Sequence, residues 1–257
     1  MKALKYVVII VLNILFCPFI KAQDAKYALH VTNVFGWSDR VINLPDNNGF
    51  SGIAGNPGQE AMELEKAGFY LEGGILGEVF ITRRVGIHTG IKVQRYQGDI
   101  SISTTNEWAP LFSQGNDLSR FTEVRVREHD TYLAAPIGVS FRLASSESLA
   151  VIAQFGMNIQ LYRNSGLVTN LTGTNIENEF TDEYEITGYK ALSAAPYLNL
   201  LLSYKLNDNW RFFGGVCGNH QVISAYEARF SSSIRQYWRS AHIVYGVSWM
   251  IAEEKKS

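Results

Sequence analysis

Cysteine is nearly absent from this chain, and its scarcity excludes two kinds of site. The 257 residues include 2 cysteines, Cys17 and Cys217. Cys17 lies in an apolar N-terminal run, and Cys217 stands alone in the rest of the chain. We therefore expect neither an internal disulfide nor a multi-cysteine metal site. The Gly-Lys-Ser/Thr pattern of a phosphate-binding loop and any His/Cys metal cluster are also missing. The sequence predicts no cofactor and no metal.

An excess of charge of one sign is missing as well. Lys and Arg number 23 against 24 Asp and Glu, for a formal net charge of -1. The chain therefore has no basic field for a nucleic-acid partner. Beyond the N-terminus, no window holds the roughly 18 consecutive apolar residues of a membrane helix. By length alone, the chain could form one large all-β domain or two smaller ones.

The N-terminus has the features of an export signal. Lys2 and Lys5 form a short basic region, YVVIIVLNILFCPFI supplies an apolar core, and Ala22 offers a small residue for cleavage. A single anchoring helix is the alternative, but the core is short and a processing-like sequence follows it. We expect residues 1–22 to be a cleaved signal peptide and residues 23–257 to form one domain.

What the chain does contain is strict alternation of apolar and polar residues. In LAVIAQFGMNIQLY (149–162) the odd positions are apolar, whereas the even positions include Gln, Asn and Gly. This pattern is typical of a β-strand with one apolar face. It predicts eight strands, at 27–35, 69–81, 85–93, 133–143, 149–162, 192–206, 210–216 and 241–251. Small and neutral polar residues crowd the second face, which suits a narrow barrel interior better than the solvated face of a sandwich.

The connections between these windows alternate strictly in length. Three are short and four are long: 82–84, 144–148 and 207–209 against 36–68, 94–132, 163–191 and 217–240. Short periplasmic turns and long extracellular loops are typical of outer-membrane barrels, whereas a sandwich has no reason to place all its long loops at one end. We therefore predict an all-β fold, an eight-stranded antiparallel up-and-down transmembrane β-barrel in a bacterial outer membrane. Both termini would be periplasmic, and the first and last strands would pair.

Aromatic residues near the strand ends predict two interfacial belts. We place Phe141, Tyr204, Trp210, Phe212 and Trp249 at the short-turn end, and Phe69 and Tyr162 near the other. Aromatics are also simply good strand residues. Their position at strand ends favours the belts.

Six ionisable residues fall on the less apolar phase of the predicted strands. They are Glu72, Glu78, Lys92, Arg142, Lys205 and Arg211. One interpretation is a polar plug or gated path through the barrel. We favour a polar network of internal salt bridges that fills a lumen too narrow for a channel.

One strand carries a resemblance to a known family. The segment TYLAAPIGVSFRL (131–143) resembles the Tyr-Leu-x-x-Pro-hydrophobic strand of the PorT-like outer-membrane β-barrel domain family, and the signal ending in AQ is similar to those of its Bacteroidota members. The closing GVSWMI (246–251) looks like a barrel-assembly signal, although AEEKKS follows it instead of a terminal aromatic. The resemblance covers residues 24–251 and implies a fold and a location, but no chemistry.

Catalysis needs separate consideration, because some barrels of this architecture are lipid-modifying enzymes. The catalytic candidates are His220, Ser224 and Glu227, with His129 and Asp130 as a second group near the long loops. Neither group has the spacing of a hydrolase motif, and a nucleophile needs a base within hydrogen-bond reach. We therefore expect no enzyme.

The expected function is non-catalytic: envelope structure, surface binding, or an accessory role in secretion or assembly. The alternative is a lipid A acyltransferase or deacylase, and a narrow solute pore comes third, because eight strands leave little lumen. The expected partners are outer-membrane lipid and lipopolysaccharide, the barrel-assembly machinery, and a secretion complex or extracellular ligand, with no nucleic acid.

Overall fold

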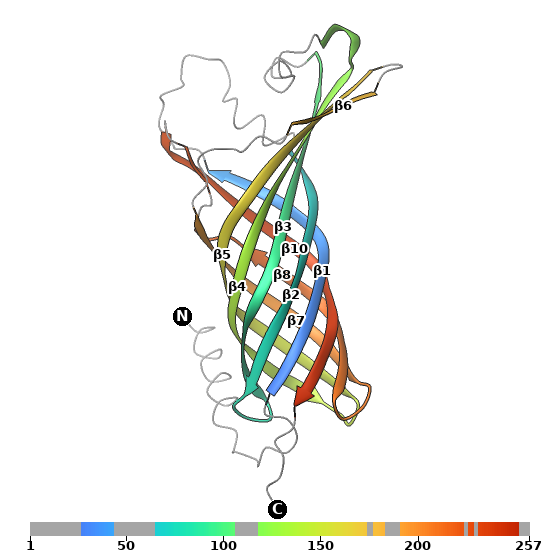
Figure 1. The fold of residues 1–257 in the computed structure, drawn as a ribbon, viewed down its shortest axis with the longest axis vertical. Coiled ribbons are helices and arrows are strands. Elements are labelled where there is room, and N and C mark those ends of the chain that lie inside the picture. The colour runs from blue at the N-terminus through green and yellow to red at the C-terminus, as the bar shows by residue number, and fades with distance from the viewer. Residues whose placement is uncertain are drawn as a thin grey trace, which may run out of the picture.

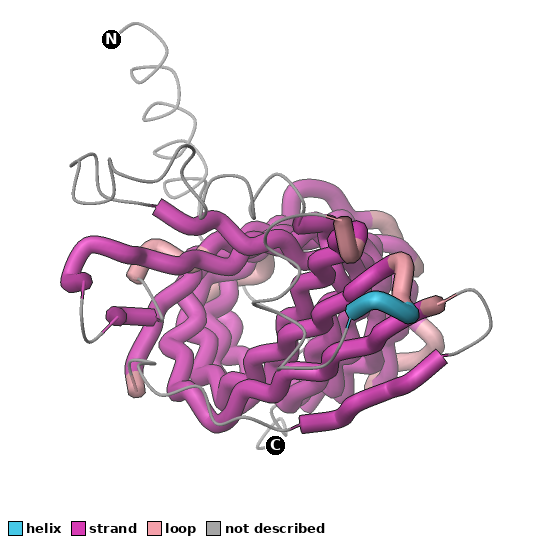
Figure 2. The backbone as a smooth tube through the Cα atoms, turned by 90° about the horizontal axis from the view of Figure 1, so that it is seen from above, coloured by secondary structure: helices cyan, strands magenta, loops and turns pink. Residues whose placement is uncertain are grey.

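A computed structural model describes residues 27–43, 65–105, 118–173, 177–182, 191–223, 226–228 and 231–251. Its dominant feature is a closed ring of eight long strands (Figures 1 and 2). They are β1 (Tyr27–Asn43), β2 (Glu65–Phe80), β3 (Val85–Ser103), β4 (Glu123–Ser145), β5 (Leu149–Thr172), β7 (Leu192–Lys205), β8 (Trp210–His220) and β10 (Ser231–Ile251). Each pairs antiparallel with its neighbours in the ring. The predicted eight-stranded barrel is confirmed.

The ring closes where the first strand meets the last. The pairing of β1 with β10 is continuous from Tyr27 opposite Ile251 to Asn43 opposite Arg235. Closure leaves no strand edge with unpaired backbone groups, which hydrocarbon does not tolerate. None of the described segments is a helix long and apolar enough to cross a membrane.

The short turns are held by side chains typical of turns. Thr82 Oγ1 accepts hydrogen bonds from the backbone N–H of Arg84 at 3.1 Å and of Val85 at 3.0 Å. Asn207 Oδ1 does the same for Asn209 at 3.0 Å and Trp210 at 2.9 Å. Such side chain-to-backbone bonds two or three residues ahead fix tight reversals.

The long connections contain short elements that the sequence did not predict. Strand β6 (Glu177–Asp182) pairs with β5, and β9 (Tyr226–Ala228) pairs with β10. A 3₁₀ helix, η1 (Leu118–Arg120), precedes β4. The predicted signal peptide at residues 1–22 lies outside the described residues.

The two faces of the wall differ in polarity as the alternation predicts. Large apolar side chains are exposed on the outside of every ring strand, from Leu29 on β1 to Trp249 on β10. Buried polar side chains such as Gln154 and Asn199 point inward. At the turn end, the outward rings of Trp210 and Trp249 stack with centroids 6.3 Å apart, where the sequence predicts a belt.

Tyr162 is a correction to the predicted outer belt. It packs against the buried interior, with its ring edge-on to that of Tyr132 at a centroid distance of 5.9 Å. Its even position continues the inward phase of the strand that begins at Leu149. The register then shifts, because Tyr132 faces Tyr162 while Thr131 faces Asn164. This bulge reverses the phase of β5 beyond Arg163.

Strand lengths make the barrel wall uneven. Strands β4 and β5 have 23 and 24 residues, whereas β8 has 11. A tilted strand needs about 9–11 residues to cross the hydrocarbon. The paired ends of β3, β4 and β5 therefore extend well beyond the membrane, and β6 adds to β5 at the top of this projection (Figure 1).

Candidate functional site: the sealed barrel interior

A buried carboxylate organises the middle of the lumen. Glu72 of β2 accepts hydrogen bonds from Lys92 Nζ at 2.7 Å, Gln94 Nε2 at 2.6 Å and Tyr70 Oη at 2.6 Å. Lys92 and Gln94 lie on the adjacent strand β3, where Gln94 is the direct partner of Glu72 in the ladder. The side chains of Glu72 and Lys92 are almost fully buried. The attraction between their opposite charges, together with their hydrogen bonds, offsets the free-energy cost of removing both charges from water.

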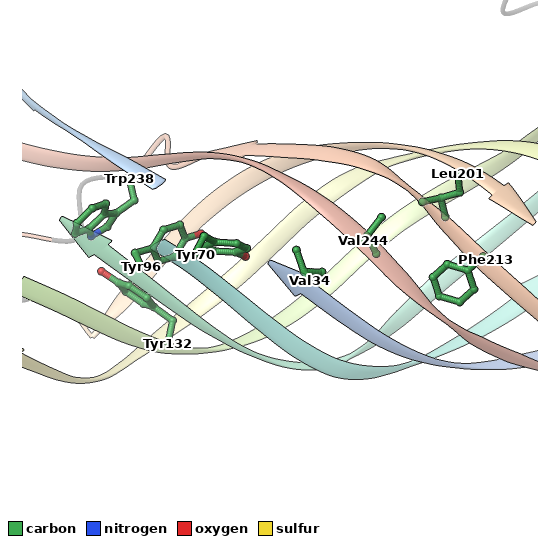
Figure 3. Packing of buried hydrophobic residues seen from close by; sticks show 8 residues of the cluster. All are labelled: Val34, Tyr70, Tyr96, Tyr132, Leu201, Phe213, Trp238 and Val244. Carbon is green, nitrogen blue, oxygen red and sulfur yellow. The ribbon is translucent and has the colours of Figure 1, made fainter. Parts of the chain in front are cut away.

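An aromatic plug closes the lumen towards the long loops. We give this name to Tyr70, Tyr96, Tyr132 and Trp238, each fully buried and drawn from four strands (Figure 3). Tyr96 is central: its ring stacks on Trp238 at a centroid distance of 5.6 Å and lies 4.9 Å from the ring of Tyr70. Trp238 Nε1 donates a hydrogen bond of 2.7 Å to Asp130 Oδ2. The plug thus combines ring packing with hydrogen bonds to Trp238 and Tyr96.

A chain of amides ties the plug to the charged centre. Gln160 Nε2 donates to Gln94 Oε1 at 2.7 Å and to Tyr96 Oη at 2.9 Å. Gln221 Nε2 donates to Gln160 Oε1 at 2.9 Å, and Gln221 Oε1 accepts from the backbone N–H of Trp238 at 3.0 Å. These amides are fully buried. Because each link is satisfied, the network fixes one arrangement of the plug.

Beneath the plug lies a small cavity of about 40 Å³. By the volume that one water needs, it has room for about three. Its polar lining includes Glu72, Glu78, Lys92, Asn158, Asn199 and His242. Its apolar lining is Val34, Leu76, Ile152, Leu201, Phe213 and Val244. Asn158 Oδ1 is buried without a partner among the described residues, which makes it a position for a bound water.

A second carboxylate lies towards the turn end. Glu78 is paired with His30 Nε2 at 2.9 Å and accepts a hydrogen bond from Ser140. His30 Nδ1 is 2.7 Å from Ser248 Oγ on the opposite side. Since the carboxylate only accepts, His30 Nε2 is the donor of the bond to Glu78. Strands β1, β2, β4 and β10 are joined here.

Two glycines make room for a buried tyrosine. Tyr197 Oη and His88 Nε2 are hydrogen-bonded, and Lys92 Nζ lies 5.4 Å from the centroid of the same tyrosine ring. A Cβ on Gly138 would lie 2.2 Å from Tyr197 Oη, and one on Gly156 would lie 2.7 Å away. The small residues on the inward phase therefore accommodate large ones that reach across the lumen.

The six predicted interior residues are divided between two places. Glu72, Glu78 and Lys92 line the cavity. Arg142, Lys205 and Arg211 lie at the turn end and are half-buried. Lys205 pairs with Asp208 in the adjacent turn at 2.6 Å, and this ion pair holds the pKa of Asp208 below its usual value, chiefly through the hydrogen bond from Lys205. The structure thus joins three of the six around one cavity and leaves the other three apart from it.

The catalytic candidates are not assembled by the described residues. His220 is exposed at the end of β8, and its ring lies 6.4 Å from that of Tyr237. Ser224 lies outside the described residues, and only the backbone of Glu227 is described, in the pairing of β9 with β10. Asp130, of the second candidate group, is buried and bonded to Trp238 in the plug.

The polarity of the outer and inner faces shows in which environment the barrel lies. Large apolar side chains are exposed around the whole ring, while the charged and amide side chains of the middle are buried inside. A soluble monomer does not expose a continuous apolar belt of this extent, whereas an outer-membrane barrel requires one. The protein is an outer-membrane β-barrel.

Comparison with known proteins gives similar solved structures but no similar sequence. No family profile and no curated protein sequence matches the chain. Among solved structures, it is similar to the outer membrane protein OprG from Pseudomonas aeruginosa, with 11% identity, a TM-score of 0.41, and coverage of 90% of this chain and 97% of that one. It is also similar to Neisserial surface protein A, with 7% identity, a TM-score of 0.40, and coverage of 88% and 97%. The Escherichia coli outer membrane protease OmpT matches with 7% identity, a TM-score of 0.37, and coverage of 90% and 99%. The PorT-like resemblance stays a prediction.

Proposed function

We propose that the protein is a non-catalytic surface-binding protein, in which a sealed barrel anchors a projecting wall outside the cell. The observation that carries this proposal is the excess length of β4 and β5, with 23 and 24 residues against the 11 of β8. In outer-membrane barrels the short turns are periplasmic, which would place the long strand ends outside. The parts of β4 and β5 beyond the bilayer are not needed to cross the membrane. Their side chains are therefore available to bind a ligand.

The wall consists of residues 99–103 of β3, 123–127 of β4 and 168–172 of β5. One face of it is apolar and buried, through Val124 on β4 and Leu171 on β5, which are direct partners. This burial gives the projection a packed core of its own. A rigid wall loses little conformational entropy when it binds a ligand.

The other face of the wall is charged. Arg125 Nη2 lies 2.8 Å from Asp99 Oδ2, and Arg127 Nε lies 3.4 Å from Asp99 Oδ1. Glu123 lies on the same phase of β4, so this face carries two carboxylates and two guanidinium groups, and the side chains of Arg125 and Arg127 remain partly exposed. Arginine suits phosphate, sulfate and carboxylate groups, because its planar fork donates two parallel hydrogen bonds. The proposed ligand is therefore an anionic polysaccharide or lipopolysaccharide.

Two further observations support this role over its alternatives. The plug fills the lumen with four fully buried aromatic rings, which opposes a solute pore. The spacing of His220, Ser224 and Glu227 matches no hydrolase motif, which favours a non-catalytic role over a hydrolase or acyltransferase. Roles with the assembly machinery or a secretion complex stay predictions.

Binding by the purified barrel in nanodiscs tests the proposal. Lipopolysaccharide and a sulfated polysaccharide would be the two probes, measured at low and physiological salt. The double variant Arg125→Gln/Arg127→Gln should lose several-fold in affinity. The matched control is Arg83→Gln/Arg84→Gln, which removes the same charge from the exposed turn at the other end. Equal loss in both variants would indicate non-specific charge attraction and contradict the proposal, as would the absence of binding to either probe.

The enzymatic alternative has its own test. Lipid A from cells with and without the protein would be compared by mass spectrometry, together with a His220→Ala variant. We expect identical acyl chains in all three. A change in acylation that depends on His220 would overturn the non-catalytic assignment.

A further inference from the structure

One polar side chain lies on the lipid-facing surface in the middle of an apolar strand. Asn33 of β1 points outward between Val31 and Phe35, and it is exposed. The outward residues of this strand begin with Tyr27 and end with Trp37 in the membrane band. At the rise and tilt of such strands, six residues beyond Tyr27 place the amide about 15 Å from the turn-end interface, which is about mid-depth of the apolar band.

The described part of the barrel offers this amide no hydrogen-bond partner. The side chain of Asn33 makes no hydrogen bond to the part of the chain that the structure describes. Hydrocarbon offers neither donor nor acceptor, so an isolated amide there loses its bonds to water without replacement. Polar side chains at this depth are expensive and usually have a partner within the membrane.

The strand next to Asn33 carries two glycines on its outward face. Its two ladder partners are Gly73 on β2 and Tyr245 on β10, and Gly77 lies further along the outward face of β2. A Cβ on Gly77 would meet no heavy atom within 4 Å, and one on Gly73 would come no closer than 3.8 Å, to Asn33 Oδ1. The inward Gly90 differs, because a Cβ there would lie 2.1 Å from a backbone oxygen. Packing within the barrel therefore does not require glycine at the two outward positions.

We propose that this surface is the interface of a homodimer within the membrane, with Asn33 at its two-fold axis. A primary amide carries both a donor and an acceptor, so two copies related by a two-fold axis satisfy each other reciprocally. The Nδ2 of each Asn33 donates to the Oδ1 of the partner's Asn33. The outward glycines let the two sheets approach closely, as small residues do at interfaces within membranes. An acyl chain makes neither bond, whereas a second copy always brings the matching group.

Cross-linking in native membranes tests the geometry. In a Cys217→Ser background, Asn33→Cys places a thiol at the proposed axis, where the two copies bring identical positions together. Phe155→Cys is the matched control, because Phe155 is lipid-exposed on β5, four strands from β1 around the ring, and lies six residues beyond the turn-end start of its strand, as Asn33 does. Mild oxidation should give a disulfide-linked dimer for Asn33→Cys and little for Phe155→Cys. Equal yields would reflect random collision and would overturn the proposal.

The energetics need a second pair of variants. Asn33→Leu removes the amide, and Gly77→Leu places a bulky side chain between the proposed copies. Each should raise the dimer dissociation constant by about tenfold or more, as measured by energy transfer between labelled copies in vesicles. Both add apolar surface to the lipid face, so folding should persist, and heat-modifiable migration in gels checks it. Unchanged association in Asn33→Leu, or a wild-type chain that is monomeric at every density, would overturn the proposal.

Discussion

The Glu72–Lys92 pair gives the most quantitative test of the interior. At an effective dielectric constant of about 20, opposite unit charges at the observed separation of 2.7 Å attract by about 6 kcal/mol. Desolvation offsets part of this attraction, but removing one partner of a buried pair leaves the other charge uncompensated. Glu72→Gln should therefore lower the free energy of unfolding by about 3–5 kcal/mol. The substitution preserves shape, so lost packing contributes little.

Urea unfolding in lipid vesicles measures this loss, with tryptophan fluorescence as the signal and Trp238 as a reporter within the plug. The double variant Glu72→Gln/Lys92→Gln should be less destabilised than the sum of its single variants, by about 2–3 kcal/mol. Asp39→Asn removes the partner of the more exposed Arg239 and should cost less than about 1 kcal/mol. A loss below about 1 kcal/mol in Glu72→Gln, or simple additivity of the two single variants, would refute the reasoning.

Two other predictions concern the faces and the orientation of the barrel. Leu200→Arg, on the lipid face, should cost about 2–4 kcal/mol in urea titration, whereas Gln154→Arg, which faces the cavity, should cost less; equal costs would contradict the assignment of faces. In a Cys217→Ser background, a membrane-impermeant thiol reagent should label Thr105→Cys on intact cells and should reach Asp208→Cys only after the envelope is opened. The reverse pattern would mean an inverted barrel.

The sequence predicted the ring because alternation is a local property. The windows from Val85 to Val93 and from Leu149 to Tyr162 lie within strands β3 and β5 and show the correct inward and outward phases. The strand ends were predicted less well, because beyond the bilayer the outward face no longer needs to be apolar. The bulge near Arg163 adds a change of phase that a pattern of period two does not predict.

The side chains inside the lumen were predicted less completely than the strands of the ring. The prediction of small and polar side chains in the lumen left out Tyr70 and Phe213. Tyr70 lies two residues before Glu72 and Phe213 lies two residues after Arg211, so both belong to the inward phase of their strands. The alternation could therefore have placed both aromatic side chains inside the barrel. The ion pair of Glu72 and Lys92 follows from the register of the neighbouring strands β2 and β3, whereas the ion pair of Lys205 and Asp208 depends on the geometry of the turn. The contacts of the plug join strands that are far apart in the sequence, and they form only when the ring closes. No local sequence pattern therefore predicts them.

Single-channel recording tests the central claim, that the barrel is a sealed anchor for an external surface. The wild-type protein, reconstituted in planar bilayers and compared with an open porin under the same conditions, should give no conductance steps across the accessible range of voltage. The fully buried rings of Tyr70, Tyr96, Tyr132 and Trp238 occupy the lumen and should block the passage of ions. Reproducible, discrete conductance steps from the purified wild-type chain would contradict it and would favour a solute pore.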